Sequence, residues 1–167
     1  MVIELSPLVH IEIVVPDAQK AYEFLNRLFG AERVEKEFSD ALSSTGVVKC
    51  VHVKLSDVIL QFIEPTSDKL QTLWSEHLEK KGPGVHNITF MVKDVKGAAR
   101  AFRQEGIKTL IKFPVNWSEF IESEELRDNI PPVHMIGGED IVGFRFELSE
   151  SPFKEDINPE EMRGKLS

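Results

Sequence analysis

The residues best suited to chemistry in this chain are histidines, carboxylates and amides on segments that alternate like β-strands. Imidazole and carboxylate groups bind divalent metals and transfer protons, and an amide oxygen suits a hard or borderline ion. Four such residues lie in two similar segments, 8–17 and 84–94: His10, Glu12, His86 and Asn87. A repeated segment that carries these groups twice indicates one cavity lined by both copies.

The two copies share a strand followed by a helix. Each strand ends at an aspartate that can cap the helix, Asp17 or Asp94, and these lie 77 positions apart. Superposing the aspartates aligns His10 with Asn87, one residue beyond His86. Because each module must hide one sheet face under its helix, the other faces can meet around a shared cavity. We therefore expect an α+β fold of duplicated βαβββ modules, with a cupped, mostly antiparallel sheet and helices outside.

The first module is expected over residues 1–66, a linker helix over 67–83 and the second module over 84–150. An acidic insertion at 116–132 is either a loop or short helix over the cavity mouth or a solvated surface segment. A polar C-terminal tail follows at residues 151–167.

Apolar spacing predicts a helix from Asp17 to Gly30 and another from Asp94 to Gly106. The first of these helices carries an apolar stripe: Ala21, Phe24, Leu25, Leu28 and Phe29. Alternating segments predict further strands, with the first of them only a possibility: 32–38, 47–55, 58–63, 133–136 and 142–148. The last two are expected to form a hairpin.

Composition restricts the class of protein. The chain has 167 residues, of which 41% are hydrophobic, so it can bury a core. Its formal net charge of −8 argues against nucleic acid and against an anionic membrane surface as partners. A single cysteine, Cys50, cannot form an internal disulfide, and the first residues do not resemble a secretion signal. We therefore expect a cytoplasmic protein.

Strand parity separates residues under a helix from those lining the cavity. In the first copy it places His10 and Glu12 toward the cavity. In the second copy it places three residues there, Asn87, Thr89 and Met91, and it turns His86 toward the helix. Parity leaves open which face of the strand with Gln61 lines the cavity, while the apolar neighbours of Glu147 favour the cavity side for that carboxylate.

Several motifs in order carry a family resemblance. They are His10-Ile-Glu-Ile-Val-Val-Pro-Asp, Leu60-Gln-Phe-Ile-Glu-Pro, Gly84-Val-His-Asn-Ile-Thr-Phe and Gly143-Phe-Arg-Phe-Glu-Leu-Ser. Together they resemble the vicinal-oxygen-chelate superfamily, which includes glyoxalases, bleomycin resistance proteins and dioxygenases. Within it the pattern is most similar to methylmalonyl-CoA epimerases and glyoxalase-type lyases.

The resemblance implies a divalent metal, Zn, Co, Ni, Mn or Fe, held by one side chain from each quarter of the duplicated fold. The matching positions are His10, Gln61, Asn87 and Glu147. The epimerases usually have histidine where Asn87 stands, and His86 matches a residue that is not a ligand. Three outcomes remain open: Asn87 binds weakly through its carbonyl oxygen, a bulge brings His86 into the ring, or the pocket has lost its metal.

The resemblance also implies proton abstraction beside a carbonyl that the metal polarises. The epimerases use a first-module glutamate for this step, but the matching stretch, residues 43–47, contains no carboxylate. Glu12 is a possible substitute base, or it merely pairs with Arg145 or Lys54. The candidate catalytic residues are therefore Glu12, Glu147 and, as a spare acid or ligand, His134. Of the two other histidines, His52 is expected to be structural and His77 to lie at the surface.

Three functions remain open. The first is a metal-dependent isomerase, epimerase or lyase that enolises a small carbonyl, carboxylate or thioester substrate. The second is a non-haem iron dioxygenase, which needs two histidines and one carboxylate. The third is a metal-free, drug-sequestering protein with an aromatic pocket, for which there are three candidates: Phe113, Trp117 and Phe120. The resemblance also implies a homodimer.

Overall fold

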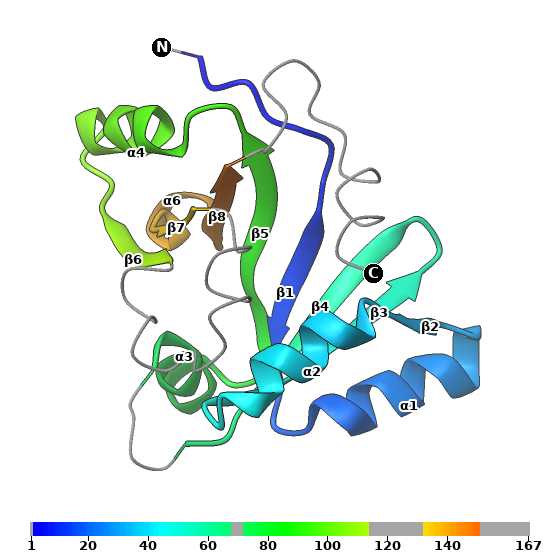
Figure 1. The fold of residues 1–167 in the computed structure, drawn as a ribbon. Helices are drawn as coiled ribbons and strands as arrows, with labels where there is room; N and C mark the ends of the chain where they lie inside the picture. Colours follow the sequence, from blue (N-terminus) through cyan, green and yellow to red (C-terminus); the bar gives the residue numbers. More distant parts are fainter. Residues whose placement is uncertain (1, 68–71, 114–131, 151–167) are drawn as a thin grey trace. The chain divides into compact units, whose positions relative to one another are not determined.

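The computed structural model describes residues 2–67, 72–113 and 132–150, and they divide into two compact units (Figure 1). The first unit contains residues 10–86, and the second contains residues 2–9 together with 87–150. The predicted tail lies outside the described residues, as does the predicted insertion apart from Pro132. No helix in the described part is long and apolar enough to cross a membrane.

The first unit contains four strands and three helices, followed by the start of a fifth strand. In chain order they are β1 (His10–Val14), α1 (Ala18–Phe29), β2 (Glu32–Val34), α2 (Lys36–Ser44), β3 (Val48–Leu55), β4 (Val58–Pro65), α3 (Leu73–Lys81) and the first residues of β5 (Gly84–Val92). The strands β1 to β4 bond in the order β2-β3-β4-β1. Strand β1 is parallel to β4, and the other neighbours are antiparallel.

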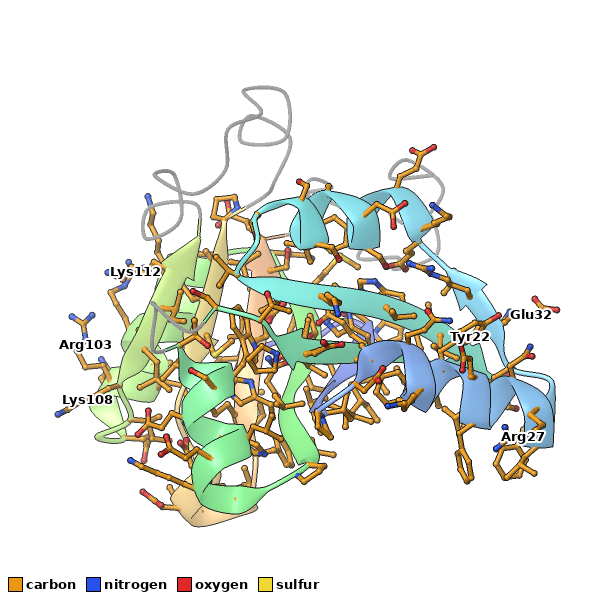
Figure 2. The ribbon with its side chains drawn as sticks, turned by 90° about the horizontal axis from the view of Figure 1, so that it is seen from below. Tyr22, Arg27, Glu32, Arg103, Lys108 and Lys112 are labelled. Atoms are coloured by element: carbon orange, nitrogen blue, oxygen red, sulfur yellow. The ribbon has the colours of Figure 1, made fainter. Side chains whose placement is uncertain are left out.

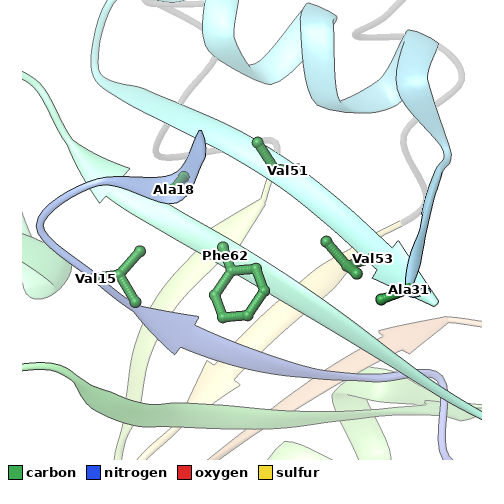
Figure 3. Close-up of a cluster of buried hydrophobic side chains, with 6 residues drawn as sticks. All are labelled: Val15, Ala18, Ala31, Val51, Val53 and Phe62. Carbon is green, nitrogen blue, oxygen red and sulfur yellow. The ribbon is translucent and has the colours of Figure 1, made fainter. Parts of the chain in front are cut away.

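Helix α1 has the predicted caps. Asp17 accepts a hydrogen bond from the Lys20 N–H at 2.9 Å, and Gly30 ends the helix with a φ of 67°. A glycine is favoured there because the left-handed conformation strains residues that carry a Cβ. Between α1 and the sheet lies an apolar cluster, shown in Figure 3: Val15, Ala18, Ala31, Val51, Val53 and Phe62.

Two expectations for the first unit need correction. Three residues of the predicted apolar stripe are largely exposed, namely Phe24, Leu28 and Phe29, because α1 contacts the sheet through Ala21, Tyr22 and Leu25. The possible strand at 32–38 is only three residues long, and α2 follows it where no helix was expected. Helix α2 has no side-chain cap at its start, so it lacks the usual sequence signal.

The second unit repeats the first. It contains most of β5, then α4 (Val95–Gln104), β6 (Thr109–Phe113), β7 (Val133–Ile136), α6 (Glu139–Val142) and β8 (Arg145–Glu150). The strands bond in the order β5-β8-β7-β6, with β5 parallel to β8 and the others antiparallel. The same order and polarity in both units confirm the duplicated, mostly antiparallel α+β fold.

Helix α4 covers one face of the second sheet. Asp94 caps it by accepting a hydrogen bond from the Gly97 N–H at 2.7 Å. Apolar residues join α4 to the sheet: Val92, Val95, Ala98, Ala99, Ile136 and Leu148. Cationic side chains such as Arg103 and Lys108 point away from this core (Figure 2). The predicted pairing of the last two strands is confirmed, because β7 and β8 are antiparallel neighbours, but the short helix α6 lies in their connection and β8 starts at Arg145.

Candidate active site

The first unit carries a polar row on the sheet face opposite α1. Glu12 on β1 is the register partner of Gln61 on β4, which in turn is the partner of His52 on β3. Leu60 and Phe62 face the α1 cluster, which resolves the open parity and puts Gln61 on the other face. His10 lies on the same face, with its ring centroid 5.7 Å from that of His52. The sequence-based placement of His10 and Glu12 away from α1 is confirmed.

The Glu12 carboxylate is buried and hydrogen-bonded. Its Oε1 accepts a hydrogen bond from Trp74 Nε1 at 2.7 Å and lies 2.6 Å from His86 Nδ1. His77 contacts the His86 ring edge to face, with centroids 5.3 Å apart. Strand parity had turned His86 toward the following helix, and His77 was expected at the surface. Instead, both histidines are buried where α3 packs against the strands.

His52 is fully buried beneath α2. Ser39 Oγ lies 2.8 Å from its Nδ1, and Glu35 Oε2 lies 3.6 Å from its Nε2. Burial, together with the nearby His10 and Arg33, holds the pKa of His52 well below its usual range. The ring is therefore neutral at pH 7, so its contact with Glu35 is not an ion pair.

Cys50 lies next to this cluster, with its Sγ 3.7 Å from His52 Nδ1. Burial, and secondarily the charge of Glu12, raises the pKa of the thiol to about 12. A protonated thiol is a poor nucleophile and a poor metal ligand. The structure therefore gives Cys50 a packing role, in line with its position in the sheet.

The second unit brings two of the predicted site residues together. Asn87 on β5 donates a hydrogen bond from Nδ2 to Glu147 Oε2 on β8 at 3.3 Å. Thr89 donates from its hydroxyl to Asn87 Oδ1, also at 3.3 Å. Phe146 and Leu148 belong to the cluster under α4, so Glu147 lies on the opposite face. The parity predicted for Asn87 and for Glu147 is confirmed.

His134 does not share the face of Glu147. In the β7–β8 ladder the partner of Glu147 is Met135, whereas His134 pairs with Leu148 on the face that α4 covers. The expected placement of His134 beside Glu147, as a spare acid or ligand, is therefore wrong. The sequence placed His134 on the strand next to that of Glu147 but gave no register between them, and a difference of one residue decides which face a side chain takes.

The predicted metal ligands divide between the units, with His10 and Gln61 in the first and Asn87 and Glu147 in the second. Within the described part of the chain, no three histidine, cysteine, aspartate or glutamate side chains gather as a metal site. Imidazole, amide oxygen and carboxylate groups are suitable donors for a divalent ion. Asn87 does not fit the ligand role, because its amide turns the NH₂ group toward Glu147.

Sequence reasoning missed the partners of the buried polar groups. Trp74 was assigned to the linker helix by its apolar spacing, and Ser39 lies in a helix that was not expected. Neither contact is local in sequence, since Trp74 lies 62 residues from Glu12 and Ser39 lies 13 from His52. The aromatic candidates for a binding pocket lie outside the described side chains: Phe113, Trp117 and Phe120.

The structure contains two strand–helix modules of equal topology. In each module, polar side chains lie on the sheet face that the helix leaves uncovered. These features define a glyoxalase-type protein. The chain belongs to the Glyoxalase/Bleomycin resistance protein/Dioxygenase superfamily, whose family model matches residues 9–117. This match confirms the resemblance seen in the sequence motifs. No curated protein matches the chain.

Solved structures of methylmalonyl-CoA epimerases have a similar fold. The enzyme from Mycobacterium tuberculosis is 19% identical with a TM-score of 0.62, and the match covers 90% of this chain and 91% of that one. A methylmalonyl-CoA epimerase in complex with methylmalonyl-CoA and NH4+ is 24% identical with a TM-score of 0.60, over 92% and 99% of the two chains. A variant of the Streptomyces coelicolor enzyme, in complex with 2-nitronate-propionyl-CoA, is 23% identical with a TM-score of 0.59, over 90% and 100%. At these sequence identities, the similarity to these enzymes shows a shared fold alone.

Proposed function

We propose that this protein is an isomerase or epimerase of glyoxalase type that acts on the carbon beside a carbonyl group. Membership of the superfamily and the fold shared with methylmalonyl-CoA epimerases support this reaction class. The observation that carries the proposal is Glu147, a half-buried carboxylate on the face opposite α4, which accepts a hydrogen bond from Asn87. A carboxylate held in this way is suited to take a proton from carbon.

In the proposed reaction Glu147 removes the proton next to the carbonyl, and the electron pair of that C–H bond moves onto the carbonyl oxygen as an enolate. The enolate carbon then takes back the proton from Glu147, which restores the original centre, or takes a solvent proton on the opposite face, which inverts the centre and leaves the Glu147 proton to be lost to water. A divalent ion, when bound, would stabilise the enolate oxygen as a Lewis acid. By resemblance, Glu147 is one of the residues that would hold it.

Glu12 is the weaker candidate for the base. Its Oε1 accepts a hydrogen bond from Trp74 and makes a short contact with His86, so proton transfer to that atom would break buried contacts. Those contacts favour a role in holding α3 against the strands. The dioxygenase alternative lacks support, because Asn87 occupies the position where its second histidine is needed and His86 contacts Glu12.

The ligands of the similar structures guide the choice of substrates to test. One of them holds methylmalonyl-CoA and another holds 2-nitronate-propionyl-CoA, so CoA thioesters with a substituent at the carbon beside the carbonyl are the first compounds to test. The proposal extends to other small carboxylates and thioesters with an acidic C–H bond.

The test is exchange of the substrate C–H proton with deuterium oxide, followed by proton NMR over a panel that starts with methylmalonyl-CoA. Wild-type protein should exchange the proton, and Glu147→Gln should reduce the rate by about a thousandfold, as expected when a general base is lost. Glu105→Gln, at the exposed C-terminal end of α4, is the matched control and should exchange normally.

The same assay is run after dialysis against a chelator and after addition of Mn²⁺, Co²⁺, Ni²⁺ or Zn²⁺, with elemental analysis of the purified protein. No exchange with any compound, with or without these ions, would rule out the proposed function. Exchange that persists at the full rate in Glu147→Gln would instead remove Glu147 as the base.

A further inference from the structure

The Asn87 side chain is held by two hydrogen bonds of opposite polarity. Its Nδ2 donates to Glu147 Oε2 at 3.3 Å, and its Oδ1 accepts from the Thr89 hydroxyl at 3.3 Å. Asn87 is fully buried and Thr89 nearly so. Both donors and the carboxylate belong to the second unit, on neighbouring strands β5 and β8.

The charge of Glu147 fixes the direction of the amide. An ionised carboxylate can only accept hydrogen bonds, so the group facing it has to be the NH₂ end of Asn87. The reversed amide would set Oδ1 against Oε2, two acceptors in contact in a buried place, which is unfavourable. The Thr89 hydroxyl can serve as donor or acceptor, so it follows the orientation that Glu147 imposes.

A metal ligand at this position would need the opposite arrangement. An asparagine binds a cation through its carbonyl oxygen, and a metal-bound carboxylate faces the cation as well. The Asn87 oxygen instead accepts the Thr89 hydroxyl, while the nitrogen faces the carboxylate. The Asn87 amide therefore gives the Glu147 carboxylate a hydrogen-bond donor in place of a positively charged neighbour.

We propose that Asn87 is a positioning residue that donates a hydrogen bond to the Glu147 carboxylate, and that it does not bind a metal ion. Holding Oε2 fixes the plane of the carboxylate and so the direction from which it takes a proton. The catalytic meaning of this bond rests on the proposed function, but the bond and the missing ligation can be measured without any substrate.

The first experiment observes the Asn87 side-chain amide by ¹H–¹⁵N NMR in the full-length protein, with its signals assigned by their loss in Asn87→Asp. We expect NH₂ protons that exchange with water at least a hundredfold more slowly than those of the exposed Gln104. Glu147→Ala should shift these signals and speed their exchange, whereas the matched control Glu105→Ala should shift them little. Fast exchange that is insensitive to Glu147 would overturn the proposal.

The second experiment compares Co²⁺ and Zn²⁺ affinities by competition with a chromophoric chelator. Asn87→Leu keeps the side-chain size but has no donor or ligand atom. Made in a Glu147→Ala background it should leave the metal affinity within twofold, because a positioning residue acts only through Glu147. A further loss of more than fivefold in that background, or a shift of the Asn87 carbonyl ¹³C signal there on addition of diamagnetic Zn²⁺, would show that Asn87 is a ligand and overturn the proposal. If Asn87→Leu misfolds, the metal affinity of Thr89→Val and the ¹³C shift of Asn87 still test whether Asn87 is a ligand.

The third experiment relates the bond to the proposed reaction. Asn87→Leu should lower kcat about tenfold and leave KM within twofold, because the carboxylate loses its orientation while the substrate contacts remain. Thr89→Val should have a smaller effect in the same direction. If no compound exchanges a proton, the proposed function fails while the NMR and metal results still stand.

Discussion

The carboxylate of Glu12 and the ring of His86 meet at 2.6 Å, between Oε1 and Nδ1, inside the first unit. The same oxygen accepts the indole N–H of Trp74 at 2.7 Å. One buried oxygen thus joins β1, α3 and the start of β5, three elements that are distant in sequence. Buried polar groups are stable only when such partners are present.

Replacing Glu12 should therefore destabilise the protein. In Glu12→Leu the indole N–H and the imidazole lose their shared partner in a buried place, and we expect a loss of about 3–5 kcal/mol in the free energy of unfolding. Trp74→Phe removes one hydrogen bond and keeps most of the packing, so it should cost only about 1–2 kcal/mol. Urea denaturation followed by circular dichroism measures both.

The control for this comparison is Glu23→Gln, an exposed carboxylate on α1 that should change stability by less than about 0.5 kcal/mol. A Glu12→Leu protein as stable as wild type would show that the contact with His86 contributes nothing. The double mutant Glu12→Leu/Trp74→Phe should be more stable than the sum of the single losses predicts, because both substitutions remove the same bond.

His52 should make stability fall at acid pH. Its pKa is held well below the ordinary value of 6.5, chiefly by burial, so the folded protein excludes a proton that the unfolded chain binds. Above pH 6.5 this destabilising effect is absent, because His52 is neutral in both the folded and the unfolded state. As the pH falls below 6.5, stability should decrease by up to about 1.4 kcal/mol per pH unit until the pKa of the folded state is reached.

Urea denaturation of chelator-treated protein between pH 7.5 and 5 measures this slope, with His52→Asn as the comparison. The variant should be less stable at pH 7.5 because it loses the contact with Ser39, but its stability should depend less steeply on pH. Equal slopes for the two proteins would show that His52 takes up its proton without unfolding.

Cys50 should resist alkylation in the folded protein. Burial and a pKa of about 12 leave almost no accessible thiolate at pH 8. Iodoacetamide should modify the native protein at least a hundredfold more slowly than the urea-unfolded protein, as read by intact mass. Since Cys50 is the only cysteine in the chain, one added group reports this site alone. Rapid modification without denaturant would show that this part of β3 opens to solvent.

Sequence patterns predicted the parts of the fold that are encoded locally. The aspartates that cap α1 and α4, and the alternation that separates Gln61 and Glu147 from their apolar neighbours, all depend on residues within one element. Helix α2 was not predicted because it begins at Lys36 and its N-cap residue, Glu35, makes no side-chain cap hydrogen bond. Capping signals in the sequence cannot reveal a helix that begins without a capping side chain.

The candidate site was predicted less completely because its contacts join distant segments. Parity placed Glu12 on the correct face but could not show that α3 would bring Trp74 and His86 onto its carboxylate. For His134 the strand was predicted correctly, but the face of the sheet depends on the pairing of β7 with β8. Duplication did identify Asn87 as the counterpart of His10, but the direction of its amide depends on Glu147 across the sheet.

The first unit allows a direct comparison between an exposed aromatic ring on α1 and a buried one on β4. Phe24 is 50% exposed, whereas Phe62 is 5% exposed and lies in the cluster under the helix (Figure 3). Phe62→Ala should cost about 3–5 kcal/mol, because it removes buried surface and leaves a cavity. Phe24→Ala should cost less than about 1 kcal/mol by the same denaturation assay. A large loss for Phe24→Ala would mean that this side of α1 is covered in solution, and a fall in sedimentation coefficient for the variant would then identify a second copy of the chain as the cover.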